Sequence, residues 1–406
     1  MNDIYSQYKI RGSVTSTVTD NGCNFESAFK DFGIQNIFEE VDEESNSENF
    51  DGATFINVDF ENPLYNRFAH APKMHRCASH TLSLIVTLDA KVALTVQSFN
   101  MINHVAMTTC SSLWKEMTKS DSCNLIKNIL GADLRKPVTV RWTSLYDSLS
   151  DIVQNKNLIN EVMKQLNLPY FTQQDIDYIE EYIGVLKPIA TGINQLQNNK
   201  KFFYGELVPT LLTINSQLYE INISSLRYCA HLLTLIRDSF HRNFKPYIEF
   251  DNSVNDALLA TITHPYFKLR WVVMKNDCDN ILYLKQFLQD LLIEELKLLS
   301  KSEKKEYTSS DYDDYYKFED SSSEGMGTES YRAIQYLEEK DHTLKSLNQH
   351  PSIKKLFLKY NVTLPCSSPV EKLFSIATKV NAPQRSCLSD NTFESLVLLR
   401  TNKGNV

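Results

Sequence analysis

Five segments between residues 150 and 300 carry apolar residues at the three- and four-residue spacing of an amphipathic helix. They cover residues 152–166, 175–197, 207–218, 226–240 and 281–299. Pro188 and Pro209 fall inside two of these segments, where they are expected to kink or divide the helix because proline lacks the N–H that the helix needs. The middle of the chain is therefore predicted to be all-helical.

Short strands are predicted before this helical region. Residues 13–19 (SVTSTVT) are rich in β-branched side chains and lie between Gly12 and the turn sequence Asp20-Asn21-Gly22, which is typical of a strand that ends in a turn. Residues 24–32 have helical spacing, and residues 73–90 (KMHRCASHTLSLIVTLDA) predict a short strand that runs into a helix. The N-terminal part is therefore predicted to mix strands and helices.

The pattern near the C-terminus predicts a helix that begins close to residue 368. Ser368-Pro369-Val370-Glu371 has the S-x-x-E spacing of a capping box, with proline at the first helical position. The apolar stripe of this helix consists of Val370, Leu373, Phe374, Ala377 and Val380. As the partner in a capping box, Glu371 would have a purely structural role.

A second short helix follows the break at residues 381–383. Ser389 is expected to cap it, and Leu388 and Phe393 have the spacing of a hydrophobic staple. Its apolar side continues with Leu396, Val397 and Leu399. From spacing alone, these two helices would close the core of their own domain.

Composition narrows the class of protein. The 406 residues suffice for two or three domains, and the net charge of −8 argues against a globally basic nucleic-acid-binding protein. Eight cysteines are scattered without a C-x-x-C pair, and the N-terminus has no apolar run, so an intracellular protein with reduced thiols is expected. No stretch approaches eighteen apolar residues, so no membrane association is expected.

Two segments are too polar to be expected to order themselves. Residues 39–62 carry many carboxylates and predict an acidic, solvated loop. Residues 301–330 are rich in Ser, Asp, Glu and Tyr and predict a disordered acidic linker.

The C-terminal sequence resembles the dimerisation region of the hAT superfamily of transposases and of host proteins derived from them. The segment that carries the resemblance is SPVEKLFSIATKV…PQRSCLSDNTFESLVLLRTNK. The resemblance implies an α/β, predominantly helical fold with a partial RNase H-like core and a large all-helical insertion. The implied division is a core at 1–137, the insertion at 138–300, the linker at 301–330, and the last core helices with the dimerisation region at 331–406. It also implies a nuclear protein whose partner is a second copy or a related hAT-like chain. The dimerisation residues would be Val370, Leu373, Phe374, Ala377, Leu388, Phe393, Leu396 and Leu399.

Three further segments resemble hAT motifs in the family's order. Thr19-Asp20-Asn21 resembles the segment that carries the second carboxylate of an Asp-Asp-Glu site, and Glu371 would supply the third. Cys77 and His80 match R-C-x-x-H, while Arg141 and Trp142 match R-W-x-S. The resemblance associates all four with the active site. Taken by itself, each has a plainer interpretation.

The plainer interpretations are structural. Asp20 would bond the backbone of its own turn. Cys77 and His80 form only half of a zinc site, which is weak support for a metal. Trp142 is more often a core or surface side chain than a base-stacking platform.

The resemblance also bears on catalysis. Asp-Asp-Glu chemistry needs three carboxylates around two divalent metal ions. The first aspartate is expected on a strand several dozen residues before Asp20, but the only earlier aspartate is Asp3, and no strand pattern surrounds it. The leading prediction is therefore a transposon-derived, catalytically inactive protein that needs no cofactor and acts through dimerisation. One alternative is an active, metal-dependent transposase or nuclease that uses Mg²⁺ or Mn²⁺ and whose N-terminal strands are missing from this sequence.

The other alternative is a DNA-binding regulator. It would use a basic patch at Lys115, Lys127, Arg135, Lys136 and Arg141. Because the chain shows no BED-type zinc finger, contact with DNA would be non-specific. The competing interpretation of these residues is a solvated helix face.

Overall fold

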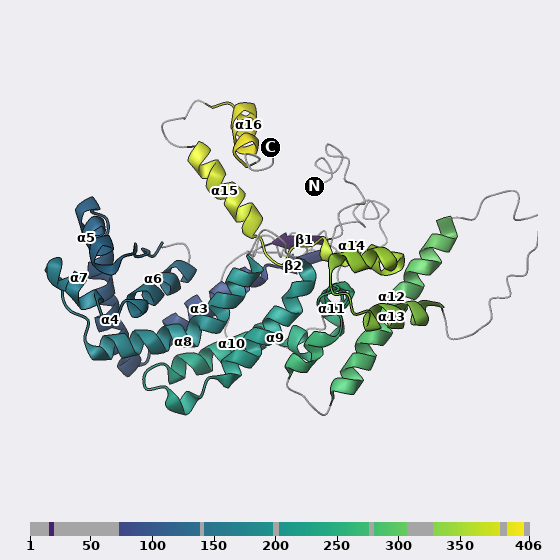
Figure 1. The fold of residues 1–406 in the computed structure, drawn as a ribbon, viewed down its shortest axis with the longest axis horizontal. Coiled ribbons are helices and arrows are strands. Elements are labelled where there is room, and N and C mark those ends of the chain that lie inside the picture. The colour runs from purple at the N-terminus through teal and green to yellow at the C-terminus, as the bar shows by residue number, and fades with distance from the viewer. Residues whose placement is uncertain are drawn as a thin grey trace, which may run out of the picture.

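The computed structural model describes residues 16–19, 73–138, 142–197, 203–275, 280–306, 328–381 and 388–401. Within these ranges the chain is predominantly helical, with two short strands at one edge (Figure 1). The prediction of a mostly helical α/β chain is thereby confirmed. Asp20, Arg141, the predicted helix at 24–32 and the acidic run at 39–62 lie outside the described residues.

The two strands form a parallel pair. Strand β1 (Ser16–Thr19) aligns with strand β2 (Lys73–Arg76) in the register Ser16 to Lys73 and Thr19 to Arg76. Helix α3 (Ala78–Ala93) follows β2 after the single residue Cys77. Both the strand within 13–19 and the strand-to-helix transition within 73–90 are confirmed.

Within the described residues, nine more helices follow α3 before residue 307. In chain order they are α4 (Gln97–Glu116), α5 (Ser120–Leu130), α6 (Trp142–Gln154), α7 (Ile159–Gln165), α8 (Gln173–Leu196), α9 (Leu207–Glu220), α10 (Ala230–Glu249), α11 (Asn255–Thr263) and α12 (Ile281–Glu306). Short 3-10 turns lie at Tyr204–Glu206, Ile223–Ser225, Asn252–Val254 and Arg270–Lys275. The remaining elements are α13 (Thr328–Glu338), a 3-10 turn at Leu344–Gln349, α14 (Pro351–Asn361), α15 (Ser368–Val380) and α16 (Asp390–Thr401).

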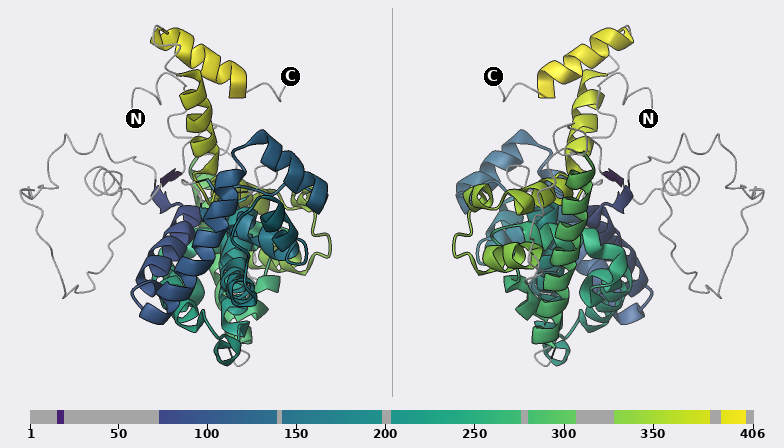
Figure 2. Two further views of the ribbon diagram at one scale, coloured as in Figure 1. Left: turned by 90° about the vertical axis from the view of Figure 1, so that its left-hand side faces the viewer. Right: turned by 90° about the vertical axis from the view of Figure 1, so that its right-hand side faces the viewer.

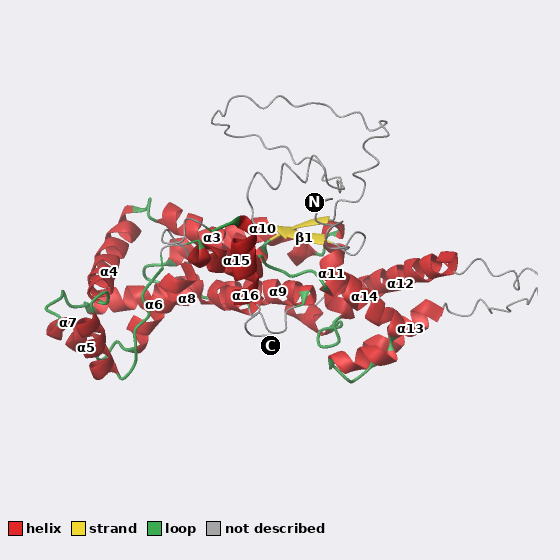
Figure 3. Cartoon of the chain, turned by 90° about the horizontal axis from the view of Figure 1, so that it is seen from above, coloured by secondary structure: helices red, strands yellow, loops and turns green. Residues whose placement is uncertain are grey.

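Helix α8 is the central rod of the helical body. Thr172 and Asp175 form a reciprocal capping box at its start, and α3, α4, α6 and α9 pack along it. Helix α10 packs between α3 and α9, and the helices lie in an elongated row when seen from above (Figure 3). The buried side chains of these helices form one continuous apolar cluster.

The predicted helices of the middle region are confirmed with three differences. The segment 152–166 is divided, because Asn155 turns its side chain onto the carbonyl oxygen of Asp151 at 2.8 Å and the helix ends there. Pro188 does not divide α8, which continues to Leu196. Pro209 lies in the first turn of α9, where its missing N–H has no helical partner to lose.

The ends of the predicted linker are helical. Helix α12 continues to Glu306, and α13 begins at Thr328. The prediction of disorder over 301–330 is therefore wrong at both ends, and residues 307–327 lie outside the described residues.

Of the helices in the described ranges, none is by itself long and apolar enough to cross a membrane. Helices α3 and α4 together have the length and apolar composition of a membrane-spanning segment, but they are bent by 111° relative to each other.

The last two helices stand apart from the helical body. Helix α15 rises from the strand edge, and α16 lies across its far end (Figures 1 and 2). The two pack against each other, and neither has a comparable contact with another described helix. The expectation from spacing alone, that they close the core of their own domain, does not describe this arrangement.

Candidate functional site

The strand pair and α15 meet at one point. The backbone N–H of Cys77 donates to the carbonyl of Thr19 at 2.8 Å, so the exits of both strands lie side by side. The N–H of Ala78 donates to the carbonyl of Pro365 at 3.1 Å, and the hydroxyls of Ser16 and Thr363 are hydrogen-bonded. Residues almost 300 positions apart in sequence are thereby held together at the start of α3.

Cys77 is the N-cap of α3. Its sulfur accepts the N–H of His80 at 3.4 Å and the N–H of Ser367 at 3.3 Å. The side chain is buried, with 1% of its surface exposed. In the described ranges, no group of three His, Cys, Asp or Glu residues is arranged to hold a metal ion. The role that the structure gives Cys77 is to join the starts of α3 and α15.

Glu371 does not occupy the position that the capping box predicted. Helix α15 begins at Ser368, so Ser367 is the N-cap and the S-x-x-E pair is one residue out of step with the helix. The Ser367 hydroxyl instead donates to Oε1 of Glu371 at 2.8 Å. Glu371 is exposed at the base of α15, with its carboxylate bonded to the side chain of the N-cap residue.

A cavity of about 610 Å³ opens beside this junction. Its walls come from α3, from α4, from Pro137 and Val138, from the start of α6 and from the base of α15. The described lining residues are Ser79, His80, Ser83, Leu84, Thr87, Trp114, Pro137, Val138, Thr143, Leu145, Gln197, Ser368, Glu371 and Lys372.

Several of the sequence-predicted site residues come together at this cavity. His80 and Glu371 line it directly, and Cys77 lies buried at the junction beneath it. Residues 138 and 143 of the lining flank Arg141 and Trp142 in sequence. Arg141 and Asp20 lie outside the described residues, and Trp142 is described only as the first residue of α6.

Trp114 is a lining residue that the sequence did not single out. It lies in the last turn of α4 and is half-buried between the cavity and the apolar cluster. Nothing in its local sequence marks it, because α4 reaches the cavity only through its bend against α3.

The chemistry of the described lining is limited. It provides one carboxylate (Glu371), one imidazole (His80) and one ammonium (Lys372), together with hydroxyl groups and the indole of Trp114. One carboxylate cannot clamp two divalent ions, so metal-assisted phosphoryl chemistry here would require Asp20 and a further carboxylate from outside the described residues.

The predicted dimerisation residues share a different environment. Phe374 and Leu399 are 64% and 67% exposed, Val370 and Leu373 are also exposed, and Ala377, Leu388, Phe393 and Leu396 are half-buried. The Ser389 hydroxyl accepts the N–H of Thr392 at 3.4 Å, as expected of a helix cap. The two helices thus present an apolar surface to solvent.

Two residues of the predicted basic patch, Lys127 and Arg135, are paired with carboxylates. Lys127 forms an ion pair with Asp133 at 2.9 Å, and Arg135 lies 2.5 Å from Asp151 and 3.1 Å from Asp147. Hydrogen bonding to Asp151 raises the pKa of Arg135, although its desolvation acts in the opposite direction. These carboxylates offset the positive charge that a phosphate backbone would need.

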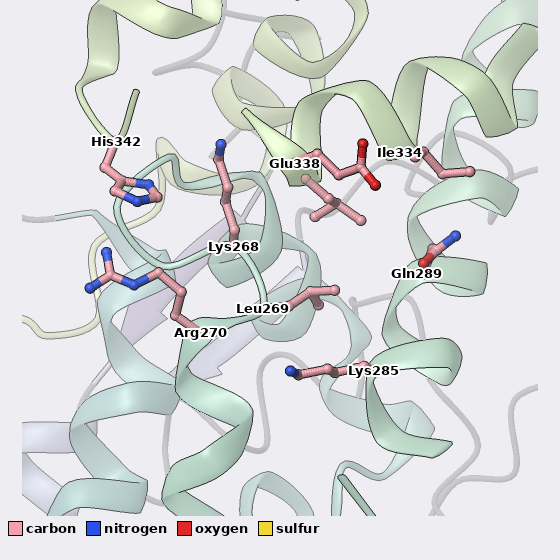
Figure 4. Close-up of a pocket in the computed structure, with 9 residues that line it drawn as sticks. Lys268, Leu269, Arg270, Lys285, Gln289, Ile334, Glu338 and His342 are labelled. Atoms are coloured by element: carbon pink, nitrogen blue, oxygen red, sulfur yellow. The ribbon is translucent and has the colours of Figure 1, made fainter. Parts of the chain in front are cut away.

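A second cavity, of about 490 Å³, lies between α12, α13 and residues 268–270 (Figure 4). Lys268 and Arg270 line it from one segment, Lys285 from α12, Glu338 from the end of α13 and His342 from the segment after α13. Lys268 is already engaged, because its ammonium donates to the carbonyl of Glu339 and lies 4.9 Å from the centre of the Tyr336 ring. None of the sequence-predicted site residues lines this cavity.

Comparison with known protein families finds no family that matches the chain, and no curated protein matches it either.

Proposed function

We propose that the chain is a transposon-derived, hAT-like protein without transposase activity, which acts by forming a homodimer through α15 and α16. The observation that carries this proposal is the apolar surface of these two helices, which stand clear of the helical body (Figure 2). Exposed apolar area of this kind is stabilised by burial against a partner.

A second copy is the partner that fits this surface. The two helices project beyond the rest of the molecule, so a second α15–α16 pair can approach without contact between the bodies. A two-fold interface brings the same patch of each subunit together, and the apolar patch of α15 and α16 is then covered by its own copy. On the same resemblance, we propose a nuclear location.

The proposed fold follows the same resemblance. Strands β1 and β2, α3 and α15 would belong to an RNase H-like core, and helices α6 to α12 would form the insertion. What supports this is the parallel strand pair, together with the return of the chain at Pro365 to the start of α3.

The test is the molar mass measured by light scattering after size exclusion. The wild type is expected to be a dimer, and Leu373→Asp with Phe374→Asp a monomer. Burying a leucine or phenylalanine contributes about 1.5–3 kcal/mol, so the double substitution should weaken the dimer at least about a hundredfold. Both side chains are exposed in the single chain, so the fold itself should not be harmed.

The matched control is Leu282→Asp with Tyr283→Asp on α12. These side chains are 82% and 71% exposed, and they lie on a different part of the molecule. The control is expected to remain dimeric. A wild type with the mass of one chain, or a control that dissociates equally, contradicts the proposal.

The second candidate function is a metal-dependent DNA nuclease or transposase. It is favoured by the cavity, which brings His80 and Glu371 to the edge where β1 ends. If this function is correct, the full chain nicks DNA with Mg²⁺ or Mn²⁺, and both Asp20→Asn and Glu371→Gln abolish nicking. Glu394→Gln, on the exposed surface of α16, is the control that should retain it. No nicking by the wild type with either metal rejects this candidate and leaves the dimer proposal intact.

A further inference from the structure

A pair of buried cysteines lies at the junction between α3 and α15. Cys77 and Cys366 are 1% and 5% exposed, and both are free thiols. They are far apart in sequence, so only the fold brings them together. The pair lies where the described start of α15 is hydrogen-bonded to the start of α3.

The backbone geometry places the two residues within reach of a disulfide. The hydrogen bond from Ala78 N to Pro365 O, 3.1 Å long, sets residues 77–78 beside residues 365–366. A disulfide joins residues whose Cα atoms are about 4.4–6.8 Å apart, so residues on adjacent chain segments are candidates for one.

The side chains support the same conclusion. The Cys77 sulfur lies 3.3 Å from the N atom of Ser367, the residue that follows Cys366. That places the sulfur within about 6 Å of the Cys366 Cα atom, allowing about 2.5 Å from N across the peptide bond to that Cα. The Cys366 sulfur donates to the carbonyl of Leu196 at 3.0 Å, and releasing this bond frees it to turn toward Cys77.

The two thiols are not equivalent. Two backbone N–H groups point at the Cys77 sulfur from the starts of two helices, an arrangement that stabilises negative charge on sulfur. Burial raises the pKa of the Cys366 thiol, and this effect outweighs the hydrogen bond from the Ser368 backbone, which acts in the opposite direction. Cys77 is therefore the thiol that attacks an oxidant, and Cys366 the thiol that resolves the product. The cavity is lined by Ser79 and Ser368, which lie close in sequence to the two cysteines.

We propose that Cys77 and Cys366 form a reversible disulfide that fastens the base of α15 to the start of α3. With hydrogen peroxide as the oxidant, the Cys77 thiol becomes a sulfenic acid and one water is released. The Cys366 thiol then attacks this sulfur, a second water leaves with the Cys366 proton, and the S–S bond forms. A dithiol reductant returns both thiols.

The test uses the full chain in the folded state. The reduced protein is treated with hydrogen peroxide, its unreacted thiols are blocked, and it is digested without reductant for mass spectrometry. The expected result is a linked pair of peptides that contain Cys77 and Cys366, together with the loss of two of the eight thiols. Dithiothreitol should restore both.

Cys366→Ser should abolish the linked peptide. Cys77→Ser should do the same without harming the fold, because a serine hydroxyl is a good N-cap and can accept the His80 N–H. Cys229→Ser, at a buried thiol that begins α10, is the matched control and should leave the link intact. Circular dichroism checks that each variant is folded.

A folded wild type that loses no thiols, or in which Cys77 links to a different cysteine, overturns the proposal. A disulfide between Cys77 and Cys366 that forms only in denaturant also overturns the proposal. This result is independent of the proposed dimer, since the thiol count and the peptides are measured whether the chain is a monomer or a dimer.

Discussion

At the scale of single residues, His264 shows most clearly how burial changes a side chain's chemistry. It lies among the rings of Phe203, Phe267 and Phe357, at centre-to-centre distances of 5.1–5.8 Å. Its Nδ1 atom accepts the N–H of Tyr266 at 3.3 Å. Burial lowers the pKa of this imidazole to about 4, because a charged ring would lose its hydration there.

This shift predicts a loss of stability in acid. In the unfolded chain, the His264 imidazole takes up a proton below its ordinary pKa of about 6.5. In the folded chain, the same imidazole stays neutral until the pH falls to its lowered pKa of about 4. The free energy of unfolding should therefore fall as the pH drops from 6.5 to 4, by at most about 3 kcal/mol from this residue. Urea unfolding across that range measures the fall.

The control for this prediction is His264→Asn, whose side-chain oxygen can replace Nδ1 as the acceptor without titrating. The variant should show a smaller fall across the same pH range. Burial also lowers the pKa of His350, so part of the fall should remain. Identical slopes for wild type and variant would show that His264 is not the cause.

Glu371 shows what the sequence can predict at this scale. The S-x-x-E spacing predicted a helix start to within one residue, and that one residue changes the role of the side chain. With Ser367 as the N-cap, Glu371 is not the capping partner and instead faces the cavity. Local spacing finds helix ends only to within a residue or two, whereas this role depends on the register.

At the scale of elements, Glu181 is the tie between α8 and the start of α10. Its carboxylate accepts the N–H groups of Arg227 and Tyr228, both at 2.8 Å, and of Cys229 at 3.1 Å. Three donors that no backbone carbonyl satisfies are thereby bonded to a charged group.

Glu181→Ala is therefore expected to lower the free energy of unfolding by about 2–3 kcal/mol, since the N–H groups lose a charged acceptor. The neighbouring Glu180→Ala is the matched control. Glu180 pairs with Lys156 at 2.6 Å on the surface, where such pairs contribute about 1 kcal/mol or less. Equal losses for the two variants, measured by urea unfolding, would contradict the assigned role.

The helices themselves were predictable, and their partners were not. Apolar spacing located α8, α9, α10 and α12, because each must bury one face. The same spacing in α15 and α16 predicted that they close the core, yet Val370, Phe374 and Leu399 of these helices are exposed. Spacing shows that a face is apolar but not what covers it, which depends on where the chain places the helix.

At the scale of the whole molecule, the organising feature is the junction of β1, α3 and α15. Backbone hydrogen bonds join Cys77 to Thr19 and Ala78 to Pro365, and they bring segments far apart in sequence together. No local pattern predicts such long-range contacts. Of the residues that the resemblance to hAT transposases associates with an active site, His80 and Glu371 lie at one cavity in the described structure. Asp20 and Arg141 remain predictions.

The central claim is that α15 and α16 join two copies of the chain. The most direct test is the molar mass of the full chain in solution, measured by light scattering over a range of concentrations. We expect the wild type to have a molar mass of twice the 46.8 kDa of one chain. Leu373→Asp and Phe374→Asp together should restore the mass of a single chain. A wild type that keeps the single-chain mass at every concentration would contradict it.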